Sequence, residues 1–263
     1  MATILTDIFV TCKPVSHRLE LFERSLSSLF ENTSRDQYRL TICLDGTSQD
    51  DGSRFREAAR SIDPDYVIES RENEGLGPTI NRAIAHICTI NEYYEHPTHG
   101  DLSKVAPFIT MCQDDLIYSP NWLKKLASYF IIFERDHKIG FASGVECIEH
   151  PVRKTIMGGE VVLKDWIRAA QMMGRREYWK SMMPIPRFDP ETGRVRAKPN
   201  DGIGSGVDWW LIRNHENSIC KTGRTCLTVP GLVAHAGYDK STWLKNGVEM
   251  PESDYDKRMV RNG

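Results

Sequence analysis

The stretch Pro107-Phe-Ile-Thr-Met-Cys-Gln-Asp-Asp-Leu-Ile-Tyr-Ser-Pro120 joins an apolar run to two adjacent acids. Its first part is short, rich in β-branched and aromatic residues and bounded by proline and polar residues, which predicts a buried strand. Gln113, Asp114 and Asp115 would then lie at the carboxyl end of that strand, where open α/β sheets bind their ligands. The stretch therefore predicts both a fold class and the position of a site.

The two adjacent carboxylates need a reason to be together. Like charges this close repel, so either solvent screens them or a cation lies between or beside them. Oxygen ligands of this kind suit Mg²⁺ or Mn²⁺, which commonly join a carboxylate to a substrate diphosphate. The alternative is a solvated turn whose acids cap the next helix, but Ser119 and Pro120 already fit the cap and first position of that helix. The pair therefore needs an explanation other than capping.

Segments of strand type and helix type alternate on both sides of this stretch. We predict strands at 8–12, 39–44, 66–69 and 139–143, and helices at 17–31, 55–62, from Pro78 onward and from Trp122 onward. This order predicts a mostly parallel central sheet with right-handed crossovers, flanked by helices. The alternation fades after about Gly144, so the predicted class is α/β with a more irregular second half.

Composition limits the kind of protein. The chain of 263 residues is 40% hydrophobic and 27% charged with a net charge of -2, which excludes a uniformly basic binder. No stretch approaches the roughly 20 apolar residues of a membrane span, and the first residues do not resemble a signal peptide. Seven cysteines at irregular spacing indicate reduced thiols. We expect a soluble cytoplasmic protein, in the host cytoplasm if the source is viral.

Five segments carry a family resemblance when they are taken in order. They are Asp45-Gly-Thr-Ser, Glu72-Asn-Glu-Gly-Leu-Gly-Pro-Thr-Ile-Asn-Arg82, Gln113-Asp-Asp115 with the following Ser-Pro-Asn-Trp-Leu, Gly206-Val-Asp-Trp-Trp-Leu211, and Val229-Pro-Gly-Leu-Val-Ala-His235. Together they resemble the Asp-Gly-Ser, Asn-x-Gly, Asp-x-Asp, Glu-Asp-x-x-Leu and metal-binding His elements of nucleotide-sugar-dependent glycosyltransferases of the GT-A fold, in particular family 2.

The resemblance covers residues 6–237 and implies one GT-A domain. Its nucleotide-sugar-binding half would span residues 1–115, its acceptor-side half 116–240, and a C-terminal tail 241–263. Two departures from the family pattern stand out. Gln113 replaces the first Asp of Asp-x-Asp, so that position hydrogen-bonds a ribose without charge, and Val207 replaces the Glu that usually precedes the base.

The resemblance also implies a metal-dependent, inverting mechanism. Asp115 and His235 would bind Mn²⁺ or Mg²⁺ together with the donor diphosphate, which offsets the charge of the leaving nucleoside diphosphate. Asp208 would be the general base that deprotonates an acceptor hydroxyl as it attacks the anomeric carbon. Asp208 could instead cap the helix that begins at Trp209, and the histidine could be a core residue.

The donor implied is a nucleotide sugar, most often a UDP-sugar. Asp45 would accept a hydrogen bond from the base and Arg71 would stack on it, although Asp-Gly is also a common turn. The residues expected around the donor nucleotide are Thr11, Pro14, Asp45, Arg71, Asn73, Gly75, Arg82, Gln113 and Asp114.

Charge in the second half bears on the acceptor. The segment 153–198 carries eleven Lys or Arg against five Asp or Glu, a net charge of +6 in a chain of net charge -2. Aromatic residues interleave with these charges, so an anionic acceptor near Arg175, Arg176, Trp209 and Trp210 is one interpretation. That acceptor would be a hydroxymethylated base in DNA, as in some phage enzymes, or a phosphorylated glycan. The other interpretation is a core of aromatics beside a solvated basic loop.

Two other functions fit the same fold class. A sugar nucleotidyltransferase would need a glycine-rich phosphate loop directly after the first strand, and Thr11-Cys-Lys-Pro-Val15 offers none. A nucleotide-binding or nucleic-acid-binding module without catalysis is the third possibility, and donor hydrolysis would distinguish it from an enzyme.

Overall fold

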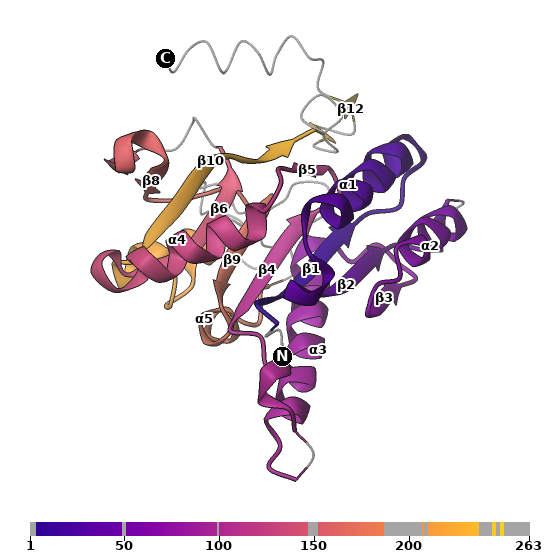
Figure 1. The fold of residues 1–263 in the computed structure, drawn as a ribbon. Helices are drawn as coiled ribbons and strands as arrows, with labels where there is room; N and C mark the ends of the chain where they lie inside the picture. The colour runs from indigo at the N-terminus through magenta and orange to yellow at the C-terminus, as the bar shows by residue number, and fades with distance from the viewer. Residues whose placement is uncertain are drawn as a thin grey trace.

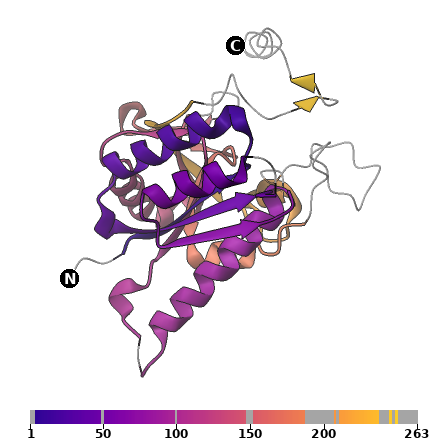
Figure 2. The ribbon, with the colours of Figure 1, turned by 90° about the vertical axis from the view of Figure 1, so that its right-hand side faces the viewer.

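The structure is a computed structural model that describes residues 4–48, 51–98, 100–146, 152–186, 207, 210–236, 244–245 and 248–249. At its centre is one mixed sheet with helices on both faces (Figures 1 and 2). In spatial order its strands are β3 (Tyr66–Ser70), β2 (Tyr38–Asp45), β1 (Thr6–Cys12), β4 (Phe108–Gln113), β9 (Gln171–Arg175), β6 (Ile139–Val145), β10 (Thr225–His235), β8 (Val161–Lys164) and β7 (Val152–Ile156). The short strand β5 (Leu116–Tyr118) also pairs with β10, and β11 (Leu244–Lys245) pairs with β12 (Val248–Glu249).

The predicted α/β architecture is confirmed, with its parallel strands concentrated in the first half. β3, β2, β1 and β4 run parallel, and helices connect them along the chain. Beyond β4 the sheet is mixed, because β9 runs antiparallel to both β4 and β6 while β6 and β10 are parallel. The loss of regular alternation after Gly144 corresponds to this change in pairing.

The helices form two layers. They are α1 (Leu19–Asn32), α2 (Gly52–Ser61), α3 (Leu76–Glu95), α4 (Trp122–His137), α5 (Arg176–Ser181) and α7 (Ile219–Thr222). Short 3-10 helices are η1 (Ser16–Arg18), η2 (Arg35–Gln37), η3 (Leu102–Lys104) and η4 (Met157–Gly159), and η5 (Trp210–Asn214) is a π-helix. The apolar faces of α1, α2 and α4 share one buried cluster, and those of α3 and α5 share another. Figure 2 shows α1 and α2 on one side of the strands and α3 on the other.

The alternation of side chains in β1 explains why both layers form. Ile8, Val10 and Cys12 join the cluster beneath α1, whereas Phe9 points to the opposite face and joins the cluster of α3. Successive residues of a strand face opposite sides of the sheet, so an unbroken apolar strand needs a helix on each face. With both faces covered by helices, the carboxyl ends of the parallel strands are the part of the sheet left for a ligand.

One local prediction after β4 is wrong. The helix begins at Trp122, as its apolar spacing predicts, but its N-cap is Asn121 at a φ of 60°, so Pro120 is not its first residue. Ser119 does not cap it, since its Oγ donates to the carbonyl of Gly231 at 2.8 Å. The three residues before Ser119 form β5, a strand that the sequence did not indicate. Among the described residues, every helix is too short or too polar to cross a membrane.

Candidate active site at the carboxyl edge of the sheet

Parallel pairing brings the predicted donor-side residues to one edge of the sheet. Thr11 pairs with Cys43 on one side and with Gln113 on the other, so the ends of β1, β2 and β4 lie side by side. The Thr11 hydroxyl donates to the carbonyl of Cys112 at 3.4 Å, and Pro14 is buried just beyond the strand. The register therefore places Gln113, Asp114 and Asp115 at the carboxyl end of the parallel strands, as their position in the sequence predicted.

The pairing of β5 with β10 brings His235 to the acid pair. The antiparallel register sets Leu116 opposite His235, and the amide of Ala236 donates to the carbonyl of Asp115 at 2.8 Å. Nε2 of His235 consequently lies 3.1 Å from Oδ1 of Asp115. Two side chains that the sequence assigned to one metal are thus adjacent in the structure.

Arg18 is a third member of the site, and sequence reasoning missed it. Its Nη2 donates to Oδ1 of Asp114 and, at 2.8 Å, to Oδ2 of Asp115. Only 7% of the Arg18 side chain is exposed, against 6% for Asp114 and 3% for Asp115. The charge of an arginine in a short turn ahead of a helix gives no sign of burial. The available signal was the acid pair itself, which required a cation.

Burial and pairing act differently on the two acids. Burial raises the pKa of Asp114 above its ordinary value, with the Arg18 charge opposing that rise. Burial also tends to raise the pKa of Asp115, but the interactions with His235 and Arg18 outweigh it and lower the pKa below the ordinary value. Asp115 is therefore the acid whose ionised form is favoured, and of the two it is the candidate metal ligand.

The donor set at Asp115 fits a divalent cation. Two adjacent ligands of an octahedral ion with bonds of about 2.1 Å lie about 3.0 Å apart, close to the 3.1 Å between Oδ1 of Asp115 and Nε2 of His235. Within the described ranges, no group of three or more His, Cys, Asp or Glu side chains is arranged to hold a metal. The chain would therefore supply two ligands, and diphosphate or water the others, as Mg²⁺ sites often do.

Asp45 holds the loop that follows β3. Its carboxylate accepts from the backbone amides of Glu74 at 3.0 Å and Gly75 at 2.8 Å, and from the Ser70 hydroxyl at 2.8 Å. It also lies 3.5 Å from Nη2 of Arg82. Because these donors engage both oxygens, the structure gives Asp45 a loop-holding role beside the base-binding role that the resemblance implies.

The other donor-side residues surround that loop. Gly75 has a φ of 90°, a conformation that side chains disfavour, and it precedes α3 directly. The Asn73 side chain accepts from the Gly75 amide at 3.2 Å, and Arg82 forms an ion pair with Glu74. Arg71 is exposed at the rim. This loop is an open, polar surface next to the carboxyl end of β2.

A side chain on α3 ties this region to the second half of the chain. Asn81 Nδ2 donates to the carbonyl of Ile185 at 2.7 Å, and the amide of Ile185 donates back to Oδ1 at 2.8 Å. The two bonds reproduce the exchange between paired residues of a sheet.

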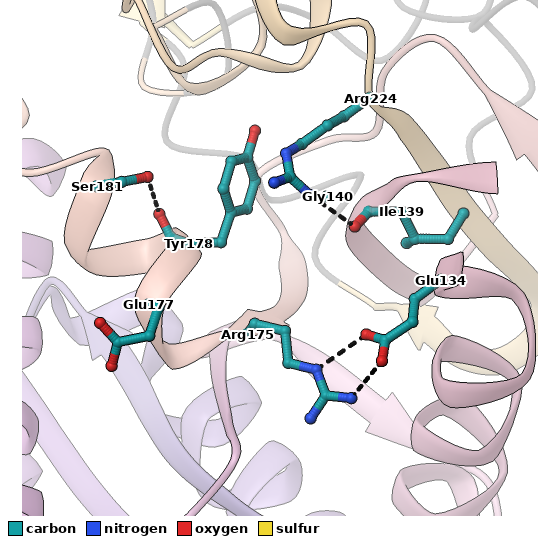
Figure 3. Close-up of a pocket in the computed structure, with 8 residues that line it drawn as sticks. All are labelled: Glu134, Ile139, Gly140, Arg175, Glu177, Tyr178, Ser181 and Arg224. Carbon is teal, nitrogen blue, oxygen red and sulfur yellow. Dashed lines mark hydrogen bonds and ion pairs between the residues drawn. The ribbon is translucent and has the colours of Figure 1, made fainter. Parts of the chain in front are cut away.

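The structure does not bring Arg175 and Arg176 to the site. Arg175 pairs with Phe108 at the start of β4, whereas the acid pair follows its end. Its guanidinium donates to both oxygens of Glu134 (Figure 3), and Arg176 forms ion pairs with Glu95 and Glu177. The acceptor role of these two arginines stays a prediction, and the structure sets them in ion pairs near the start of β4, away from the acid pair.

The remaining acceptor-side residues lie partly outside the description. Asp208 and Trp209 fall outside the described residues, so their roles stay predictions. Trp210 is half-buried against the cluster of α3 and α5, with its ring centroid 5.3 Å from that of His215. Its indole is therefore partly a core side chain.

Comparisons with known proteins identify the fold. No family model matches the sequence, and no curated protein matches it. GalNAc-T7, crystallised with UDP, GalNAc and Mn²⁺, aligns with a TM-score of 0.56 at 10% identity, over 89% of this chain and 44% of its own. A mannosyltransferase of Pyrobaculum calidifontis in complex with GDP-Man and Mn²⁺ aligns with a TM-score of 0.55 at 15% identity, over 97% and 60%. S. aureus TarS 1–349 aligns with a TM-score of 0.51 at 12% identity, over 89% and 61%.

These structures are glycosyltransferases of the GT-A fold, and the present chain has that fold. The chain spans between 44% and 61% of the three chains to which it is similar. Identities of 10–15% show the fold alone, and the function has to be argued from the site.

Proposed function

We propose that the protein is a metal-dependent glycosyltransferase that moves a sugar from a nucleoside-diphosphate sugar to an acceptor hydroxyl. The observation that carries the proposal is the meeting of Asp115 and His235 at the carboxyl edge of a GT-A sheet, 3.1 Å apart. Structures similar in fold contain UDP or GDP-Man together with Mn²⁺, which supports the same donor class here.

The roles of the chain's own residues follow from their positions. Asp115 and His235 would hold Mn²⁺ or Mg²⁺, which supplies positive charge against the leaving diphosphate. The Asp45 loop would lie beside the nucleotide, with Arg71 at its exposed rim and Gln113 near the ribose. Asp208 would accept the proton of the acceptor hydroxyl, and attack opposite the diphosphate would invert the anomeric carbon.

Donor hydrolysis tests the proposal without knowledge of the acceptor. The purified chain is incubated with UDP-sugars and GDP-mannose in Mn²⁺, and release of nucleoside diphosphate is followed before and after chelation with EDTA. Slow release that EDTA abolishes and Mn²⁺ restores supports the enzyme. Donor binding without any release would instead indicate a binding module, and release that survives chelation would contradict the metal role.

The acceptor is proposed to be anionic, with hydroxymethylated DNA of the phage type as one version and a phosphorylated glycan as the other. The net charge of +6 in residues 153–198 supports this, but part of that charge is neutralised within the chain. Besides Arg175 and Arg176, Arg153 forms an ion pair with Asp165. Transfer to hydroxymethylated oligonucleotides that weakens as salt rises would support the DNA version, and salt-insensitive transfer would contradict it.

A further inference from the structure

Arg18 stands where the sequence called for a cation. It ends the turn η1, whose geometry is set by a hydrogen bond from its amide to the carbonyl of Val15 at 2.9 Å. From there its side chain reaches the acid pair and is almost fully buried. A buried charge is tolerated only when it is paired, and Arg18 is paired with both Asp114 and Asp115.

We propose that Arg18 is an internal counter-cation that competes with the divalent metal for the Asp114–Asp115 pair, so that metal enters the site together with the donor diphosphate. The proposal rests on the proposed function, because it assigns the cation site to the same residues. It adds that metal binding and donor binding depend on each other, and that Arg18, which is not itself a metal ligand, causes this dependence.

The competition has a geometric part. Arg18 Nη2 donates to Oδ1 of Asp114 and to Oδ2 of Asp115, which leaves Oδ1 of Asp115 as the carboxylate oxygen turned to His235. Oδ2 of Asp114 is buried and has no hydrogen-bond partner among the described residues. The acid pair could therefore present more oxygens to a metal than it does while the guanidinium lies across it.

The competition also has an electrostatic part. The two acids carry two negative charges and Arg18 returns one positive charge, so an approaching cation meets a net charge of -1 in place of -2. Repulsion between the guanidinium and a divalent ion is strong in a buried site, where water screens little. A diphosphate adds negative charge and oxygen ligands, and its binding offsets that repulsion. Metal and diphosphate should then favour each other's binding by the same factor.

The main alternative predicts the opposite change in metal affinity when Arg18 is replaced. If Arg18 only orients Asp115, as outer residues of metal sites do, its loss would weaken metal binding by about 10–100-fold. If Arg18 competes with the metal, its loss would tighten metal binding to the chain alone.

Mn²⁺ titration followed by the electron paramagnetic resonance signal of the free ion separates these cases, with and without saturating UDP. The test variant is Arg18→Gln, which removes the charge and keeps an amide donor. The control is Arg24→Gln, an exposed arginine on α1. Without UDP we expect Arg18→Gln to bind Mn²⁺ at least about tenfold more tightly than wild type does. Adding UDP should then raise the Mn²⁺ affinity of the variant by a smaller factor than it raises that of wild type. Arg24→Gln should match wild type.

Unchanged or weaker Mn²⁺ binding by folded Arg18→Gln would overturn the proposal. Arg18→Lys keeps the charge and should stay close to wild type, so tightening in that variant would overturn it as well. If thermal unfolding shows that Arg18→Gln does not fold, the unmodified chain provides the test, since equal Mn²⁺ affinity with and without UDP contradicts the coupling. Absence of donor hydrolysis would contradict the proposed glycosyltransferase function but would not change the measured Mn²⁺ affinities. The two proposals can therefore fail independently of each other.

Discussion

Oδ1 of Asp115 lies 3.1 Å from Nε2 of His235 because β5 and β10 pair Leu116 with His235 in antiparallel register. Without the pairing of the three-residue strand β5 with β10, nothing would hold the Asp115 and His235 side chains next to each other. The contact makes the short strand the element that assembles the candidate metal site.

Replacing His235 by Asn should impair the metal site. We expect a roughly 100-fold loss of kcat in donor hydrolysis at low Mn²⁺, because a preorganised group that supports the leaving diphosphate is removed. The matched control is His96→Gln, an exposed histidine just beyond α3. Wild-type Mn²⁺ dependence in His235→Asn would exclude the histidine as a ligand.

Replacing Asp208 by Asn tests the general base. Transfer to an acceptor should fall by about 10²–10⁴-fold, the range of general-base contributions, while donor affinity stays close to wild type. Glu216→Gln, at an exposed position shortly after it in the chain, should behave as wild type in both measurements. A parallel loss of donor affinity and transfer in Asp208→Asn would indicate a structural role.

Replacing Asp45 by Ala should loosen the loop after β3. The Glu74 amide loses its acceptor and the Gly75 amide keeps only its 3.2 Å bond to Asn73 Oδ1, and leaving a partly buried polar group unsatisfied costs about 1–3 kcal/mol. Urea unfolding measures the loss of stability, with Asp136→Ala, an exposed acid on α4, expected within about 0.5 kcal/mol of wild type. Equal stability of wild type and Asp45→Ala would show that the carboxylate does not hold the loop.

The stabilisation contributed by Asp115 should depend on pH. The pKa of Asp115 is lowered in the folded chain, so its ionised carboxylate stabilises the fold fully at pH values above 3.8, the ordinary pKa of Asp. This contribution disappears as the pH falls through the lowered pKa. The difference in unfolding free energy between wild type and Asp115→Asn should therefore be largest near pH 7 and shrink below pH 3.8. A constant difference across this range would contradict the lowered pKa of Asp115.

The repeating first half was predictable because its signals are local. Apolar runs such as β1 and β2 end in polar residues, and the stripes of α1 and α3 follow helical spacing, so element order and the position of the carboxyl edge follow from the sequence. The acid pair follows the end of β4, as its place in the sequence predicts, and His235 ends β10 beside it, while their role in metal binding stays a prediction.

The rest depended on contacts between distant segments. Arg18 is a charged residue whose burial is set by the acids it meets, and β5 is a strand only because β10 is present. The location of Arg175 at the opposite end of β4 follows from the antiparallel direction of β9, which no local pattern in the sequence announces.

The exchange of two hydrogen bonds between Asn81 and Ile185 has a consequence for how this protein can evolve. Asn81 on α3 bonds both the amide and the carbonyl of Ile185, so a single side chain fixes that backbone position against the helix. A substitution at Asn81 removes both partners of the Ile185 backbone at once, so this position should tolerate few replacements.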